Sequence, residues 1–148
     1  MLRFSKTIMG TRNSDHYATP KAFYTKLDAE FHFDLDPCPL HATRDGLTIP
    51  WKGNIYVNPP YSNIQAFLEK GLEELRKGNA KIIVYLLPVR SDTKYWHEII
   101  LKHADEIRFV KGRLNFNEKK SPAPFSTCVV IFSKINVCMH PIISSTVQ

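Results

Sequence analysis

Residues 81–87, KIIVYLL, form an almost unbroken apolar run, and no other segment limits the possible folds as strongly. A strand that faces water on one side alternates apolar and polar residues, whereas a continuous run is typical of a strand that is covered on both faces. Such a strand is flanked by helices on each side of its sheet. The run therefore predicts a central parallel strand in an α/β fold.

Helix and strand signals alternate along the rest of the chain. Thr19 before Pro20 is a typical helix start, and Ser62 with Gln65 matches a capping box. In chain order, the predicted elements are a helix at 20–30, a strand at 31–36, a strand at 54–57, a helix from 62 to 77, the strand at 81–87, a helix from 92, and strands at 106–110 and 125–132. This order predicts an α/β domain in which helices flank a mostly parallel sheet.

The length of the chain limits the number of domains. At 148 residues it is large enough for one hydrophobic core but too small for two. The segment 135–148 shows no clear hydrophobic period. We therefore expect one domain over residues 1–134 and a loose C-terminal tail over 135–148.

The strand at 54–57 is followed by the tetrapeptide Asn58-Pro59-Pro60-Tyr61, which has a specific chemistry. The Asn58 side chain and the Pro59 carbonyl are hydrogen-bond acceptors, and Pro60 has no N–H that could compete for that carbonyl. Two such acceptors can hold the amino group of an adenine so that its weakly nucleophilic nitrogen faces an electrophile. The Tyr61 ring offers a face on which an extruded base can stack. The alternative is a strand-ending proline turn with a packed tyrosine.

Two further segments follow the carboxyl ends of predicted strands, namely Asp36-Pro37 and residues 88–90. The ligand sites of open α/β sheets lie beyond these ends. We therefore expect both segments to share one rim of the sheet with the tetrapeptide.

The chain is basic, with 20 Lys and Arg residues against 14 Asp and Glu, a formal charge of +6 and a pI of about 9.3. This balance suits a polyanionic partner such as nucleic acid.

The three cysteines are odd in number and show no CxxC spacing, which argues against a disulfide or zinc framework and favours a reducing cytoplasm. The six histidines show no metal-ligand spacing, and no apolar run reaches the length of a membrane span, so we expect neither a metal site nor a membrane partner.

Taken in order, a series of short motifs over about residues 14–133 resembles the phage-type DNA N-6-adenine methyltransferases. The motifs are SDHYATP at 14–20, LDPC at 35–38, DGL at 45–47, WKG at 51–53, VNPPY at 57–61, LPVRSDT at 87–93 with Trp96-His97, GRL at 112–114 with Phe116, and APF at 123–125. Each motif outside the Asn-Pro-Pro-Tyr turn is weak alone, whereas their order and spacing together are specific.

The resemblance implies a DNA adenine-N6 methyltransferase with S-adenosylmethionine as methyl donor, acting in the cytoplasm of a bacterial host if the chain is phage-encoded. The Asn-Pro-Pro-Tyr turn would be catalytic. By the same resemblance the cofactor contacts are Tyr17, Thr19, Pro20, Asp36, Pro37 and Asp45. The first three match the segment that holds the methionine part, and the Asp36 carboxylate suits the α-ammonium group there. Asp45 stands before a glycine, where an aspartate is also a common turn residue.

The chain departs from larger methyltransferases after Asp36. It lacks their glycine-rich cofactor loop, since the first glycine after Asp36 is Gly46. Only 21 residues separate Asp36 from Asn58, too few for two further helix–strand units, because one βαβ unit takes about 30 residues. The resemblance and this spacing together predict a compact, trimmed Rossmann-like methyltransferase fold.

The 148 residues leave no room for a separate target-recognition domain, so DNA contacts are expected from basic loops. The candidates are Arg90, Lys111, Arg113, Lys119 and Lys120, of which the last two are equally typical of a solvated loop. Alternative functions stay open at this point. The chain could methylate an RNA adenine or a protein glutamine side chain, or it could be a DNA-binding module without catalysis.

Overall fold

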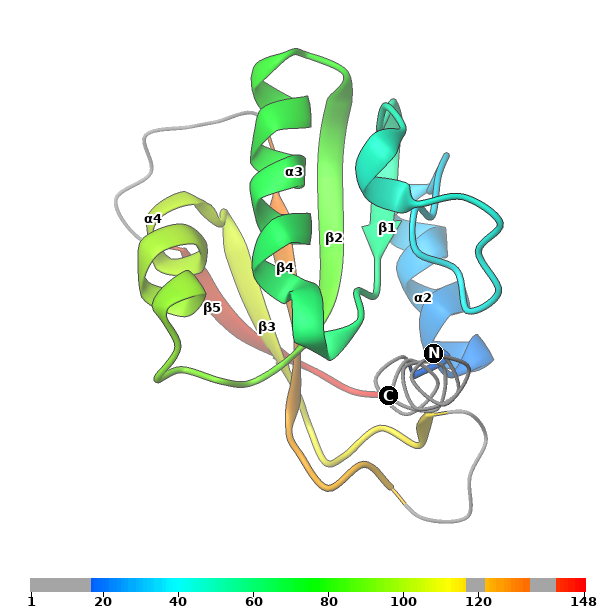
Figure 1. Cartoon of the computed structure of the whole chain (residues 1–148). Coiled ribbons are helices and arrows are strands. Elements are labelled where there is room, and N and C mark those ends of the chain that lie inside the picture. The colour runs from blue at the N-terminus through cyan, green and yellow to red at the C-terminus, as the bar shows by residue number, and fades with distance from the viewer. Residues whose placement is uncertain (1–16, 117–121, 134–140) are drawn as a thin grey trace, which may run out of the picture.

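The computed structural model describes residues 17–116, 122–133 and 141–148, which form a five-stranded sheet with helices on both faces (Figure 1). The strands are β1 (Gly53–Val57), β2 (Ala80–Pro88), β3 (Glu106–Val110), β4 (Thr127–Phe132) and β5 (Ile142–Thr146), in the spatial order β1-β2-β4-β3-β5. The helices are α2 (Lys21–Phe31), α3 (Ile64–Arg76) and α4 (Leu101–His103), and a π-helical turn at Trp96–Ile100 directly precedes α4. No helix among these residues has both the length and the apolar content to cross a membrane.

Alternating side chains of the inner strands build one core on each face of the sheet. Ile83, Tyr85 and Leu87 of β2 belong to the core that also contains α3 and the π-helical turn. Val84 and Leu86 belong to the core that contains α2. All five side chains are at most 1% exposed. This confirms the prediction that the apolar run is a strand covered on both faces.

The sheet is mixed, and the prediction of a mostly parallel sheet is wrong. β1 pairs with β2 and β3 pairs with β5 in parallel, but β4 runs antiparallel to both β2 and β3. The described part of the connection between Val110 and Thr127 contains no α-helix, and the chain returns beside β3 as its antiparallel neighbour. The connection β1–α3–β2 is a parallel crossover, and the carboxyl ends of β1, β2 and β3 lie on one rim.

The predicted strand at 31–36 forms only a single bridge. Helix α2 takes up the first residue of this segment and closes at His32, whose φ of 52° is left-handed. Leu35 then bridges in parallel to Ile55, on the outer side of β1. The alternating pattern thus describes an extended edge segment, which brings Asp36 to the rim where β1 ends.

The residues Ile142–Thr146 form the edge strand β5, although the sequence predicts a loose tail there. Ile142 and Ile143 are 68% and 57% exposed, so no buried face imposes a period of two on this strand. The predicted domain boundary at residue 134 lies outside the described residues.

Two helices begin later than the sequence predicts. A 3₁₀ turn at Tyr61–Asn63 precedes α3, which begins at Ile64. The helix predicted from Asp92 begins instead with a turn in which Thr93 donates to the Arg90 carbonyl, and its π-helical part starts at residue 96.

A buried carboxylate joins the loop before β1 to helix α3. Glu74 is 2% exposed and accepts hydrogen bonds from Trp51 N (3.2 Å), Asn79 Nδ2 (2.9 Å) and Lys70 Nζ (2.7 Å). Burial acts to raise the pKa of Glu74, but these hydrogen bonds outweigh it and set the pKa below its ordinary value. The contacts fix the chain at the point where it enters β1.

We expect Glu74→Gln to lower the free energy of unfolding by about 1–3 kcal/mol, because an amide nitrogen replaces an acceptor oxygen and leaves a buried donor unsatisfied. Thermal unfolding followed by circular dichroism measures the change. Glu73→Gln is the matched control, since Glu73 forms an exposed pair with Lys77 and its loss should leave the melting temperature nearly unchanged. Equal melting temperatures for the two variants would contradict this role of Glu74.

Candidate active site

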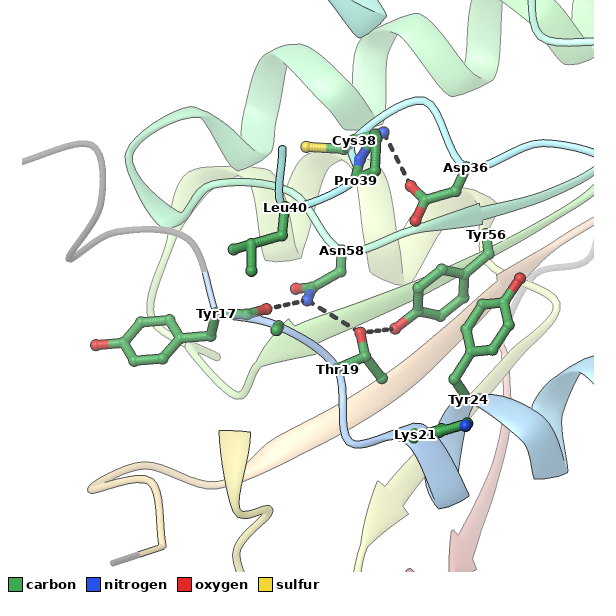
Figure 2. A pocket seen from close by; sticks show the side chains of 11 residues that line it. Tyr17, Thr19, Lys21, Tyr24, Asp36, Cys38, Pro39, Leu40, Tyr56 and Asn58 are labelled. Carbon is green, nitrogen blue, oxygen red and sulfur yellow. Dashed lines mark hydrogen bonds between the residues drawn. The ribbon is translucent and has the colours of Figure 1, made fainter. Parts of the chain in front are cut away.

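The candidate active site lies where β1 ends and the segment before α2 crosses it. A cavity of about 320 Å³ opens there (Figure 2). Its walls include four residues that the sequence predicts as site residues, namely Tyr17, Thr19, Asp36 and Asn58. Residues that are far apart in the sequence thus meet on the predicted rim.

Asn58, the first residue after β1, is 3% exposed. Its Nδ2 atom donates to the carbonyl oxygen of Tyr17 and to Thr19 Oγ1, the latter at 3.1 Å. Thr19 Oγ1 lies 2.5 Å from the hydroxyl oxygen of Tyr56. A chain of hydrogen bonds therefore connects a core tyrosine of β1, through Thr19, to the amide of Asn58, as the dashed lines in Figure 2 mark.

The rest of the tetrapeptide leads from β1 into α3. Pro60 keeps an extended backbone, with φ −61° and ψ 136°. Its carbonyl is the first helical acceptor and is bonded by Asn63 N at 3.0 Å. The Pro59 carbonyl precedes this first helical hydrogen bond.

Asp36 is a carboxylate in a poorly solvated wall of the cavity. Burial raises the pKa of Asp36 to about 6, against the opposing effect of a hydrogen bond from Cys38 N at 2.9 Å. A desolvated carboxylate gains from a cationic ligand group beside it. Lys21 lines the same cavity, so the cavity walls carry one acidic and one basic side chain.

Four rings gather at this end of the sheet, and we call Tyr17, Tyr61, Phe116 and Phe125 the aromatic cluster. Tyr17 stacks on Tyr61 with ring centroids 5.2 Å apart, and Phe125 meets Tyr61 edge-on, also at 5.2 Å. The guanidinium carbon of Arg90 lies over the Tyr61 ring, 5.5 Å from its centroid. Tyr61 is thus a packed tyrosine in this structure, with Tyr17 and Arg90 against its ring.

Three of the predicted cofactor residues shape the backbone around the cavity and do not line it. Pro20 is the cap residue of α2. The Pro37 carbonyl lies so close to Gly46 that a Cβ atom there would come within 2.0 Å of its oxygen. Asp45 caps a 3₁₀ turn by accepting from Leu47 N at 2.9 Å, which is the turn role that the sequence left open.

Sequence reasoning missed several residues of the site. The remaining cavity residues are Ala18, Lys21, Tyr24, Cys38, Pro39, Leu40 and Tyr56. Most of them are close neighbours of predicted residues in the sequence, and this proximity is the signal that could have found them. Tyr56 carries a different signal, because it lies two residues before Asn58 and therefore on the same face of β1. The sequence motifs contain Phe116 and Phe125 but do not assign them to the site.

The basic residues that are predicted to contact DNA lie partly on the same rim. Arg90 follows the carboxyl end of β2, and Lys111 and Arg113 follow that of β3. Lys119 and Lys120 lie outside the described residues. Three of the five predicted contacts therefore share the rim with the cavity.

The chain is similar to known proteins over most of its length. A family model described as DNA N-6-adenine-methyltransferase (Dam) matches residues 6–146. The DNA N-6-adenine-methyltransferase of Haemophilus phage HP1 (strain HP1c1) is 32% identical over 119 residues, which cover 70% of this chain and 68% of the phage protein. The range matched by the family model contains every residue of the cavity and of the tetrapeptide.

We expect Asp36→Asn to stabilise the ligand-free protein at pH 7.5, because the folded state no longer holds a desolvated carboxylate. The folded-state pKa of about 6 exceeds the ordinary 3.8, so the contribution of this group to stability is present below pH 4 and is lost as the pH rises through 6. The advantage of the variant should therefore be larger at pH 7.5 than at pH 4, by an amount on the order of 2 kcal/mol. Thermal melts at both pH values measure it. An advantage that does not change with pH would contradict a desolvated Asp36.

Proposed function

The chain belongs to the DNA N-6-adenine-methyltransferase family, and from this premise we propose that it transfers a methyl group from S-adenosylmethionine to the exocyclic amino group of adenine in DNA. The observation that carries the proposal is the position of the Asn-Pro-Pro-Tyr turn, at the carboxyl end of β1 and beside a cavity with a desolvated carboxylate in its wall. Asn58 belongs to both the turn and the cavity wall. The donor and the acceptor of the methyl group would therefore meet at Asn58.

The cavity fits the methionine end of S-adenosylmethionine, which supplies the methyl group when bound. Its volume of about 320 Å³ is at the lower end of the range for small-molecule pockets, about 300–1,000 Å³. Asp36 would accept hydrogen bonds from the α-ammonium group, and Lys21 would attract the α-carboxylate. The opposite charges of these side chains would thus orient the ligand.

The turn would hold the amino group of the target adenine. Asn58 Oδ1 and the Pro59 carbonyl each accept one of its N–H groups, which fixes the nitrogen in a productive position. The same acceptors would stabilise the positive charge that develops on the nitrogen as its bond to the methyl carbon forms and the bond of that carbon to the sulfonium sulfur of the donor breaks. The methylated nitrogen then loses one proton to water.

The aromatic cluster would receive the target base. A base inside a duplex cannot reach the turn, so a double-stranded substrate requires base flipping. Tyr17 stacks on Tyr61 at 5.2 Å, so a base that stacks on this face of Tyr61 would take the place of the Tyr17 ring. Arg90, Lys111 and Arg113 lie on the same rim and would neutralise phosphates of the flanking DNA.

We further infer a trimmed Rossmann-like methyltransferase fold. The parallel crossover β1–α3–β2, with the site at its carboxyl end, supports this inference. Between Asp36 and β1 the chain forms one 3₁₀ turn at Gly46–Thr48 instead of further helix–strand units, which supports the shortening.

Isotope transfer tests the proposed function directly. The protein is incubated with S-adenosylmethionine labelled in its methyl group and with DNA, RNA or protein, and the products are hydrolysed and identified by mass spectrometry. We expect label in N6-methyladenine from DNA. Label in RNA adenine or in protein glutamine would contradict DNA as the substrate. A folded protein that binds no S-adenosylmethionine would instead be a DNA-binding module without catalysis.

Asn58→Ala should lower the rate of methyl transfer to DNA at least about a hundredfold, since the missing hydrogen bond is made to the reacting amino group in the transition state. The melting temperature and the affinity for S-adenosylmethionine, measured by calorimetry, should change little. Asn54→Ala is the matched control, because Asn54 is also on β1 but donates to the Phe31 carbonyl at 2.7 Å, away from the cavity. A folded Asn58→Ala protein that transfers the methyl group at the wild-type rate would contradict the proposed role of Asn58.

DNA binding should weaken steeply with salt, because each neutralised phosphate releases counterions. We expect Arg113→Ala to reduce the slope of log Kd against log salt concentration by about 1 if Arg113 contacts a phosphate. Fluorescence anisotropy with a labelled duplex measures this slope. Arg76→Ala is the control, since Arg76 ends α3 at the opposite end of the sheet and should leave the slope unchanged. Identical slopes for the two variants would contradict a phosphate contact of Arg113.

A further inference from the structure

Tyr56 and Asn58 project from the same face of β1, because side chains two residues apart in a strand point the same way. Val57 between them packs into the core on the other face. The Tyr56 side chain is 1% exposed, and its ring contacts the rings of Tyr24 at 5.0 Å and Phe33 at 5.2 Å. Packing therefore fixes the position of the Tyr56 hydroxyl group.

The amide of Asn58 can be turned by 180° with little change in shape, but only one orientation presents an acceptor to an amino group. The Tyr17 carbonyl can only accept, so Nδ2 has to face it. Thr19 Oγ1 accepts from the same Nδ2 atom at 3.1 Å. These two contacts set Asn58 Oδ1 on the opposite side of the amide.

Thr19 can accept from Asn58 only while its own hydroxyl hydrogen points elsewhere. The Tyr56 hydroxyl lies 2.5 Å from Thr19 Oγ1, so one of these two hydroxyls donates to the other. When Thr19 is the donor to Tyr56, its only hydrogen is engaged there and a lone pair of Thr19 Oγ1 is directed at Asn58 Nδ2. Without the Tyr56 hydroxyl, the Thr19 hydrogen can rotate toward Asn58, and it would then favour the flipped amide.

We propose that Tyr56 and Thr19 are positioning residues for methyl transfer, which hold the Asn58 amide with its oxygen toward the target amino group. The inference rests on the proposed function, because it takes Asn58 Oδ1 as the acceptor for that amino group. It goes further, since Tyr56 acts through Thr19 and does not itself touch the base. Both hydroxyl-bearing residues line the cavity, so the wall that receives the methyl donor also sets the orientation of the acceptor amide.

Steady-state kinetics separates positioning from packing. Tyr56→Phe should lower kcat roughly three- to tenfold, the equivalent of one hydrogen bond, while the KM values for DNA and S-adenosylmethionine stay within about twofold. Thr19→Val should lower kcat more, and Thr19→Ser should restore most of it.

The control for these variants is Tyr85→Phe. Tyr85 is also 1% exposed, and its hydroxyl donates to the Phe67 carbonyl at 2.8 Å, in the core on the other face of the sheet. This variant should lose similar stability and keep the wild-type kcat. An equal kcat for Tyr56→Phe and Tyr85→Phe would overturn the proposal.

Nuclear magnetic resonance gives a readout that does not depend on turnover. The side-chain amide signals of Asn58 are assigned by their absence in Asn58→Ala. Their hydrogen exchange should be slow in the wild type and in Tyr85→Phe, and at least about threefold faster in Tyr56→Phe and Thr19→Val. Unchanged Asn58 signals in Tyr56→Phe would overturn the positioning role. A wild type that methylates no DNA but shows these exchange differences would contradict the proposed substrate and still support the positioning of Asn58.

Discussion

Side chains of β1 point alternately to the two faces of the sheet, and the site exists because this alternation continues one residue past the strand. Val57 packs toward α3 in one core, whereas Tyr56 belongs to the core on the α2 side. Asn58 follows the direction of Tyr56, toward the segment that enters α2. The packing that stabilises the sheet and the geometry of the candidate site therefore have the same origin.

The parts of the fold that depend on a local sequence pattern were predictable. The parts that depend on which distant segments of the chain pair with each other were not. The continuous run of β2 and the strand at Glu106–Val110 were predicted within about one residue, because burial on the faces of the sheet imposes their composition. No local pattern encodes the direction of β4, which follows from a connection without a crossover helix in its described part. The edge strand β5 is largely exposed, so its sequence carries no period.

The candidate site divides in the same way. Asp36 and Asn58 could be placed on one rim because each lies at the end of a predicted strand, whereas Tyr17 and Thr19 were assigned by the family resemblance. The bond between Thr19 and Tyr56 joins residues 37 positions apart, and such a pairing depends on how α2 docks on the sheet. The same applies to the aromatic cluster, whose members come from segments before α2, after β1 and between β3 and β4. The motif predicts which groups react, whereas the partners proposed to orient them are found only in the folded chain.

Asp36 and Asn58 both line the cavity, but burial destabilises the charged form of Asp36, whereas hydrogen bonds hold the amide of Asn58. Burial raises the pKa of Asp36 to about 6, so its charged form is held at some expense of stability until a cation binds. The amide of Asn58 is already held by Tyr17 and Thr19 and needs no reorientation when a substrate arrives. Ligand binding at Asp36 would thus restore stability to the folded state, because a ligand that binds only the folded chain stabilises it. Under the proposed function, the acceptor side would by contrast be preorganised by the fold itself. Binding energy at the donor side would then not be spent on ordering the group that meets the target base.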